Sequence, residues 1–177
     1  DEAGRFPDMI RQAFRTAVSG CPGPVHLQFR GNEGQVDQGE CEYEAITEDT
    51  FASVPPFRPA PDDASVQKAV DILQKAARPI IVSGGGVKAS GAGAELVALA
   101  ERLAIPVVTS LNGKDTFPST HPLSGGVVGT YSRESANRAV NEADLVCFIG
   151  TETGGMTTHF WAVPEIGRPA IQIDIEP

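Results

Sequence analysis

The chain has 177 residues, 41% of them hydrophobic and 21% charged, so it is long and apolar enough to bury one sizeable core. Its formal net charge of −9 at pH 7 argues against nucleic acid or an anionic membrane surface as a partner, because both require a basic surface. Its continuous apolar runs, such as residues 145–149, are far shorter than the roughly 20 residues of a membrane-spanning helix. We therefore expect a soluble globular domain without membrane or nucleic-acid partners.

The first thirty residues predict a helix, a turn and a strand. Apolar side chains recur at helical spacing through residues 6–18 with charges between them, which is typical of an amphipathic helix. A glycine and proline cluster at 20–23 stops the helix, and residues 24–29 alternate in the manner of a strand. Because an exposed apolar stripe promotes association, we expect the main domain or a neighbouring copy to cover the helix face that includes Met9, Ile10 and Phe14.

The periodic pattern disappears between residues 30 and 61. This stretch holds a run of acidic residues and a proline-rich segment at 54–61. Proline removes a backbone donor and disfavours helix, so we predict a semi-extended connector. The chain is therefore expected to divide into three segments, which are residues 1–30, 31–61 and 62–177.

From residue 62 the pattern alternates between helices and strands. Asp62 or Asp63 can cap a first helix, whose inward positions would be Val66, Ala69, Val70, Ile72 and Leu73. Further helices are predicted from about residue 90 to 103 and over 133–143. Short buried strands are predicted over residues 79–82, 106–109, 145–149 and 169–174.

Short β-branched strands that alternate with amphipathic helices indicate a parallel sheet covered on both faces. We predict an α/β fold with an open, doubly wound, mainly parallel sheet of the Rossmann-like type. A helix and strand, then the extended connector, would precede it.

A glycine turn, Gly84-Gly85-Gly86, follows the strand predicted at 79–82. Glycines let the backbone approach a ligand closely and would bring bare N–H groups to a pyrophosphate. The spacing departs from the G-x-G-x-x-G pattern, because position 89 is alanine and the predicted helix begins several residues later. Two interpretations remain open, a dinucleotide-binding turn or a tight strand-to-helix turn without a ligand.

Other polar loops are expected at the same edge, because ligands of doubly wound sheets bind outside the carboxyl ends of the strands. Loops at 109–114, 150–155 and 173–176 follow predicted strands, and their small residues and hydroxyls could surround an adenine and a ribose. Asp174 stands where a carboxylate accepts hydrogen bonds from ribose hydroxyls. A purely structural edge is the alternative.

A second glycine-rich approach to a helix covers residues 125–134. Ser132 could cap that helix. The segment therefore predicts either a capped helix entry or a ligand contact.

The sequence offers no catalytic constellation. It has no G-x-S-x-G elbow with a histidine and an acid, no Walker loop and no paired carboxylates in apolar surroundings. Glu152 and His159 could serve acid–base chemistry, but a single pair without an activating context is more often a surface contact. Scattered histidines and an odd number of distant cysteines predict no metal site, no disulfide framework and a reducing, cytoplasmic compartment. We name no catalytic and no metal-ligating residue.

Several stretches resemble the central domain of thiamine-diphosphate-dependent enzymes of the acetolactate synthase-like family. They are RPIIVSGGGV (78–87), LAIPVVTSLNGK (103–114), HPLSGGVVG (121–129), AVNEADLV (139–146) and IQIDIEP (171–177). The earlier stretch GPVHLQF (23–29) resembles the last strand of the pyrimidine-binding domain that precedes the central domain in this family.

The resemblance implies that residues 1–30 are the C-terminal remnant of the pyrimidine-binding domain, 31–61 the interdomain linker and 62–177 the central domain. The glutamate that activates thiamine diphosphate, and the Gly-Asp-Gly motif that holds magnesium and diphosphate, would belong to the two other domains. Those pyrimidine-binding and diphosphate-binding domains would be the partners of this segment, together with a second copy in a homodimer or larger homo-oligomer.

The resemblance also implies a nucleotide site, because the central domain binds FAD in acetolactate synthases and ADP in some relatives. One departure is that these enzymes typically carry an Arg-Phe-Asp-Asp-Arg-like loop after the fifth strand, where this chain reads TETGGM (151–156). FAD, ADP and an empty crevice therefore all remain open. By position, the cofactor-binding residues would be Gly84, Gly85, Gly86, Thr109, Leu111, Gly126, Gly129, Gly150 and Asp174.

Together these features imply the structural and nucleotide-binding domain of an enzyme that decarboxylates, ligates or cleaves 2-oxo acids, a transferase or lyase. This segment alone would carry no catalysis. The alternative is a free-standing nucleotide-binding or dimerisation module.

Overall fold

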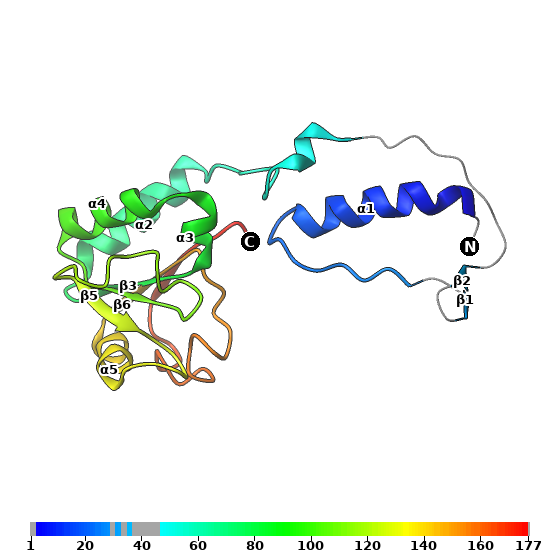
Figure 1. The fold of residues 1–177 in the computed structure, drawn as a ribbon. Coiled ribbons are helices and arrows are strands. Elements are labelled where there is room, and N and C mark those ends of the chain that lie inside the picture. Colours follow the sequence, from blue (N-terminus) through cyan, green and yellow to red (C-terminus); the bar gives the residue numbers. More distant parts are fainter. Residues whose placement is uncertain (1–2, 29–30, 33–34, 37–46, 177) are drawn as a thin grey trace. The chain divides into compact units, whose positions relative to one another are not determined.

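The structure, a computed structural model, describes residues 3–28, 31–32, 35–36 and 47–176. The chain divides into two compact units, Asp1–Pro59 and Ala60–Ile175 (Figure 1).

The first unit is built on helix α1 (Phe6–Val18), which follows a short 3-10 helix, η1 (Ala3–Arg5), and has the predicted bounds. Pro7 lies in its first turn, where the missing N–H costs no intrahelical hydrogen bond. Among the described residues, none of α1 is buried, and Met9 and Phe14 are 37% and 67% exposed. That the apolar face packs against another surface stays a prediction.

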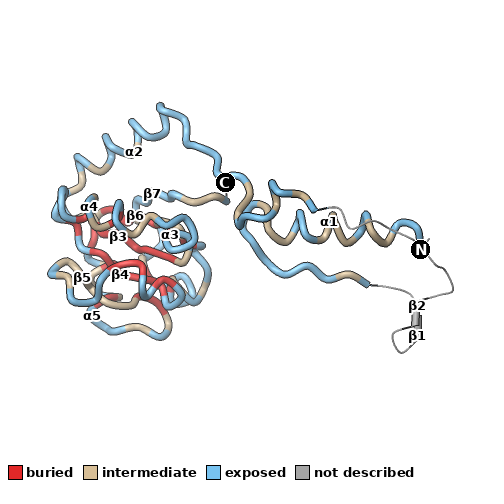
Figure 2. Tube along the Cα trace, turned by 45° about the horizontal axis from the view of Figure 1, so that its top comes forward, coloured by how far each residue is buried: buried red, intermediate tan, exposed pale blue. Residues whose placement is uncertain are grey.

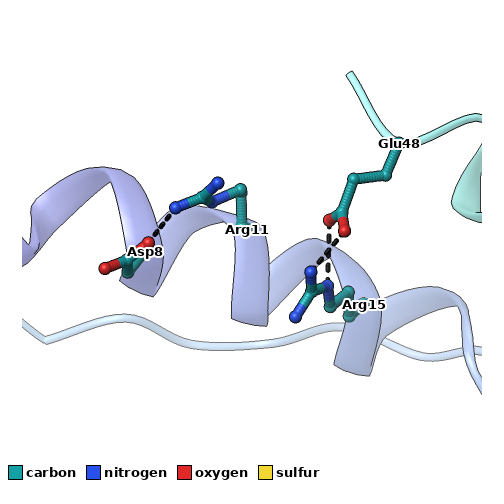
Figure 3. A network of polar contacts seen from close by, with 4 residues as sticks. All are labelled: Asp8, Arg11, Arg15 and Glu48. Carbon is teal, nitrogen blue, oxygen red and sulfur yellow. Dashed lines mark hydrogen bonds and ion pairs between the residues drawn. The ribbon is translucent and has the colours of Figure 1, made fainter. Parts of the chain in front are cut away.

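The second half of the connector contacts α1 through one arginine. Arg15 Nε donates to Glu48 Oε2 at 2.9 Å, and the guanidinium lies 5.6 Å from the Phe51 ring centre. Phe51 belongs to the 3-10 helix η2 (Asp49–Ala52) and meets the Phe57 ring edge-on. One turn earlier on α1, Arg11 pairs with Asp8 (Figure 3). The connector is thus partly folded onto the helix that it follows.

The strand predicted at 24–29 is not formed in the described residues 24–28, and Phe29 lies outside them. A strand needs a second strand beside it for its backbone hydrogen bonds, and in the part of the unit that the structure describes no strand pairs with this segment. The connector instead contributes a small antiparallel pair, β1 (Gly31–Asn32) with β2 (Gln35–Val36).

The second unit contains a five-stranded sheet in which all strands are parallel, so the predicted fold class is confirmed. The spatial order is β5-β4-β3-β6-β7. The central strand β3 pairs with β4 on one side, with Ile81 opposite Val107, and with β6 on the other, with Ile81 opposite Cys147. The strands are β3 (Pro79–Ser83), β4 (Val107–Thr109), β5 (Ser124–Val127), β6 (Leu145–Ile149) and β7 (Ala170–Ile173).

Helices cover both faces of this sheet. On one face, α3 and α4 pack against alternate strand residues such as Ile81, and α2 adds Leu73 and its C-cap residue Ala76. On the other face, α5 packs against Ile80 and Val82. The buried residues concentrate in β3, β4 and β6 (Figure 2). The helices are α2 (Asp63–Lys75), α3 (Gly85–Ser90), α4 (Gly93–Leu103) and α5 (Glu134–Glu142).

Helix α2 begins as expected, because the Asp62 side chain accepts the Ser65 N–H at 2.9 Å. Its predicted inward face is only partly right. Leu73 and Ala69 are half-buried, but three predicted inward positions are exposed, which are Val66, Val70 and Ile72. The covered stripe is narrower than the apolar pattern suggested, since α2 contacts the core mainly through its last turn.

Two further expectations were wrong and one was incomplete. The helix expected over about residues 90–103 is α4 (Gly93–Leu103), but the short helix α3 (Gly85–Ser90) before it was not expected, and Gly91 ends α3 in a left-handed conformation (φ 73°). The glycine-rich segment after residue 123 forms the edge strand β5 rather than a plain helix approach. Ser132 does not cap α5, whose N-cap position is Arg133. Across the described residues, every helix is too short or too polar to cross a membrane.

Candidate functional site

The strand order reverses between β3 and β6, which is where ligands bind in doubly wound sheets. The loops that follow these two strands are joined by backbone hydrogen bonds. Gly84 N–H donates to the Ile149 carbonyl oxygen at 2.9 Å, and Gly86 N–H donates to the Gly150 carbonyl oxygen at 2.8 Å. Gly150 N–H in turn donates to Ile173 of β7 at 2.8 Å. The predicted site residues at these strand ends therefore lie at one place on the carboxyl edge of the sheet.

The glycines at this crossing are required by close packing. A Cβ on Gly84 would lie 2.3 Å from the Gly150 carbonyl oxygen, and one on Gly150 would lie 2.6 Å from the Val87 nitrogen. The expected bare N–H groups of the turn are not found at Gly84 and Gly86, because both donate within the protein. Helix α3 also begins at Gly85, inside the glycine turn and earlier than expected.

The loop after β4 is fastened to the end of β3 by buried hydroxyls. Ser83 Oγ lies 2.6 Å from Thr116 Oγ1, which donates to the Gly113 carbonyl oxygen at 2.7 Å. Ser110 N–H donates to the Ser83 carbonyl oxygen at 2.8 Å. Ser83 and Thr116 could not be paired from the sequence, because isolated hydroxyls 33 positions apart give no spacing signal. The network fixes the position of the whole loop.

Two predicted site residues flank this network and differ in exposure. Thr109 is 6% exposed and belongs to β4, whereas Leu111 is 53% exposed. Lys88 of α3 pairs with Asp115 of the same loop, and this hydrogen bond is the main cause that lowers the pKa of Asp115. The exposed ion pair thus connects the elements that follow β3 and β4.

The loop after β5 is held by the side chain of Asn137. Its Oδ1 accepts the Gly129 N–H at 2.9 Å and its Nδ2 donates to the Gly129 carbonyl oxygen at 3.0 Å. A Cβ on Gly129 would lie 2.1 Å from the Met156 carbonyl oxygen, so this loop touches the one that follows β6. The adjacent Thr130 Oγ1 is buried and has no hydrogen-bond partner among the described residues.

The other predicted positions are also at this edge. Gly126 lies near the Arg133 side chain, since a Cβ on Gly126 would lie 3.6 Å from Arg133 Cδ. Gly85 is half-buried in the first turn of α3. Asp174 follows β7 and its Oδ1 accepts the Ile175 N–H at 2.8 Å. Within the described ranges, no group of three or more His, Cys, Asp or Glu side chains is placed to hold a metal ion.

The chain is similar to proteins of one family. Residues 66–177 match the family described as thiamine pyrophosphate enzyme, central domain. A protein of Methanocaldococcus jannaschii assigned as an acetolactate synthase large subunit is 38% identical over 177 residues, covering 97% of this chain and 29% of that protein. Glyoxylate carboligase of Escherichia coli O157:H7 is 34% identical over 177 residues, covering 99% of this chain and 29% of the carboligase.

A solved structure has the same fold. It is an enzyme of Mycobacterium smegmatis assigned as thiamin diphosphate-dependent, and it matches with a TM-score of 0.60 and 24% identity over 99% of this chain and 30% of that one. The chain therefore spans about three-tenths of the length of the proteins that it matches.

Proposed function

Because the chain belongs to the thiamine pyrophosphate enzyme central-domain family, we propose that it is the structural central domain of an enzyme that decarboxylates, ligates or cleaves 2-oxo acids. The observation that supports this most strongly is the family match over residues 66–177. The names of its relatives, acetolactate synthase large subunit, glyoxylate carboligase and sulfoacetaldehyde acetyltransferase, agree with carbon–carbon ligase or acyl-transfer chemistry. We expect the parent enzyme to be cytoplasmic and homo-oligomeric.

The reaction itself is assigned to other parts of the parent enzyme. Thiamine diphosphate would supply a carbanion when bound, and the family resemblance implies a glutamate to activate it and a Gly-Asp-Gly motif to hold its magnesium and diphosphate. This chain lacks a Gly-Asp-Gly sequence, and its described residues hold no carboxylate cluster fit for a metal. Its proposed contribution is to position the neighbouring pyrimidine-binding and diphosphate-binding domains. The proposed domain limits remain residues 1–30, 31–61 and 62–177.

We also propose that the carboxyl edge binds a nucleotide, either FAD or ADP. The loops that follow the strands lie together at this edge, where the strand order reverses between β3 and β6. This is the usual position of a ligand in this architecture. The buried Thr130 hydroxyl without a partner favours a polar ligand, since such groups are normally hydrogen-bonded. The amides of Gly84 and Gly86 do not fit a pyrophosphate, so contact there would be through close approach of the backbone rather than through those N–H groups.

The engaged glycine amides favour a second candidate, a scaffold and dimerisation domain that binds no nucleotide. Calorimetry on the 177-residue chain separates the candidates. We expect no heat with thiamine diphosphate and magnesium, and saturable binding of FAD or ADP. If neither nucleotide binds or raises the melting temperature at millimolar concentration, the scaffold candidate replaces the nucleotide site. Tight binding of thiamine diphosphate with magnesium would overturn the assignment of this chain as a non-catalytic domain.

A further inference from the structure

Two large aromatic side chains stand out from the loop between β6 and β7. Phe160 is 65% exposed and Trp161 is 60% exposed, and Trp161 is the only tryptophan of the chain. Aromatic rings are costly to leave in water and are enriched at binding surfaces. Their exposure therefore requires an explanation.

The loop is built to hold these rings in place. Three consecutive residues, His159, Phe160 and Trp161, have left-handed backbone conformations with φ of 48°, 54° and 62°, which L-residues rarely adopt. Buried Thr158 fixes this turn, because its hydroxyl donates to the Gly154 carbonyl oxygen at 3.0 Å and accepts the Trp161 N–H at 2.9 Å. Such backbone geometry persists only where the surroundings determine it, and it recurs at ligand sites.

The rings rest against a glycine at the carboxyl edge of the sheet. A Cβ on Gly155 would lie 3.3 Å from Phe160 Cδ1 and 3.7 Å from Trp161 Cη2. Along the chain, Gly155 lies between Thr151, which packs on Gly84, and Met156, whose carbonyl oxygen would meet a Cβ on Gly129 at 2.1 Å. The rings are thus anchored on the stretch of loop that joins two of the proposed nucleotide contacts.

We infer that Phe160 and Trp161 form a stacking platform for the planar ring of the nucleotide bound at this edge. The inference rests on the proposed nucleotide function and adds the residues that would recognise the ring. Adenine and isoalloxazine both offer a flat aromatic face, and stacking on aromatic side chains requires no particular hydrogen-bonding pattern. A platform of this kind would account for the exposed rings and for the rigid turn that supports them.

The test measures binding of ADP, FMN and FAD to the wild-type chain and to Phe160→Ala and Trp161→Ala. ADP presents adenine alone and FMN isoalloxazine alone, so the two arms identify the ring. Each substitution is expected to raise the Kd of the ligand that carries the stacked ring roughly 5- to 150-fold. Phe160→Tyr and Trp161→Phe should retain most of the affinity. Phe14→Ala is the matched control, because Phe14 is similarly exposed, at 67%, but lies on α1 in the other unit.

Acrylamide quenching gives a readout that does not depend on the alanine variants being folded. ADP does not absorb at 295 nm, so its stacking should protect the Trp161 fluorescence of the wild-type chain from acrylamide. The platform is contradicted if both folded alanine variants bind the nucleotide with unchanged affinity. It is also contradicted if the nucleotide binds the wild-type chain without changing the quenching of Trp161. Either result leaves the nucleotide function standing. Failure of all three ligands to bind the wild-type chain overturns the nucleotide function and the platform with it.

Discussion

The carboxylate of Asp144, the residue before β6, accepts the backbone N–H of Arg78, the residue before β3, at 2.9 Å. The same carboxylate accepts the Ala77 N–H at 2.7 Å. The bond from Arg78 is the main cause that holds the pKa of Asp144 below its usual range, and the bond from Ala77 adds to it. One side chain thus joins the two central strands at their amino ends, at the edge opposite the glycine loops.

Asp144→Asn should destabilise the chain in a pH-dependent way. Because the folded-state pKa of Asp144 is lowered, its contribution to stability is present above the unfolded pKa of about 4 and is lost as the pH falls through the lower folded value. We expect urea unfolding to show a clear deficit for the variant at pH 7 and a smaller one at pH 3. Asp71→Asn on exposed α2 serves as the control. An equal deficit at both pH values would contradict this account.

Gly84→Ala should destabilise the second unit, because the new Cβ would lie 2.3 Å from the Gly150 carbonyl oxygen and from Thr151 Cβ. Forcing the two strand-end loops apart is expected to cost about 1–3 kcal/mol in the free energy of unfolding. Gly154→Ala provides the comparison, since a Cβ at that position meets no atom within 4 Å. Chemical denaturation measures both, and similar midpoints would show that the loops do not need this close approach.

Arg15→Gln should release the second half of the connector from α1. Arg15 hydrogen-bonds Glu48 and lies over the Phe51 ring, and this arginine is the main cause that lowers the pKa of Glu48. Chymotrypsin is therefore expected to cleave after Phe51 and Phe57 faster in this variant than in Arg11→Gln, whose arginine pairs within the helix with Asp8. The lowered Glu48 pKa also predicts faster cleavage of the wild-type chain as the pH falls below about 4, which an acid-active protease can measure. Equal cleavage of both variants would show that Arg15 does not hold the connector.

Cys147 should resist thiol reagents until the sheet unfolds. It is 2% exposed in β6, and burial raises the pKa of its thiol to about 11, so almost no thiolate forms at pH 8. Exposed Cys21 should react readily under the same conditions. Mass spectrometry after labelling with and without urea measures this difference. Labelling of Cys147 in the native chain at a rate near that of Cys21 would imply that β6 opens frequently.

Much of the fold could be predicted because the relevant signals are local. Helix α1 and strand β6 have the predicted bounds, and Asp62 caps α2 as expected. The short helix α3 and the strand β5 could not be predicted, since a helix that begins inside a glycine turn and a glycine-rich edge strand depend on their neighbours in space. Periodicity gives no information about either.

The candidate site was predictable in location but not in its chemistry. The positions of Gly84 and Gly150 follow from strands ending at the same edge of a parallel sheet. That their backbones contact each other, and so engage the amides of Gly84 and Gly86, depends on the path of two loops. The supporting side chains Thr116, Asn137 and Thr158 were missed for the same reason, because each bonds a residue that only folding brings near.

The pairing of β3 with β6 has a consequence for how the chain folds. Residues 84–144 lie between these two central strands, and the other strand beside β3 is the short β4. The pairing of β3 with β6 therefore joins strands that are far apart in the sequence, and pairings of this kind slow folding because loop closure comes before the strand contacts that offset its entropy. Until β6 is synthesised, the edge of β3 that pairs with it, from Pro79 to Ser83, has no strand beside it, and an unpaired strand edge can pair with another chain.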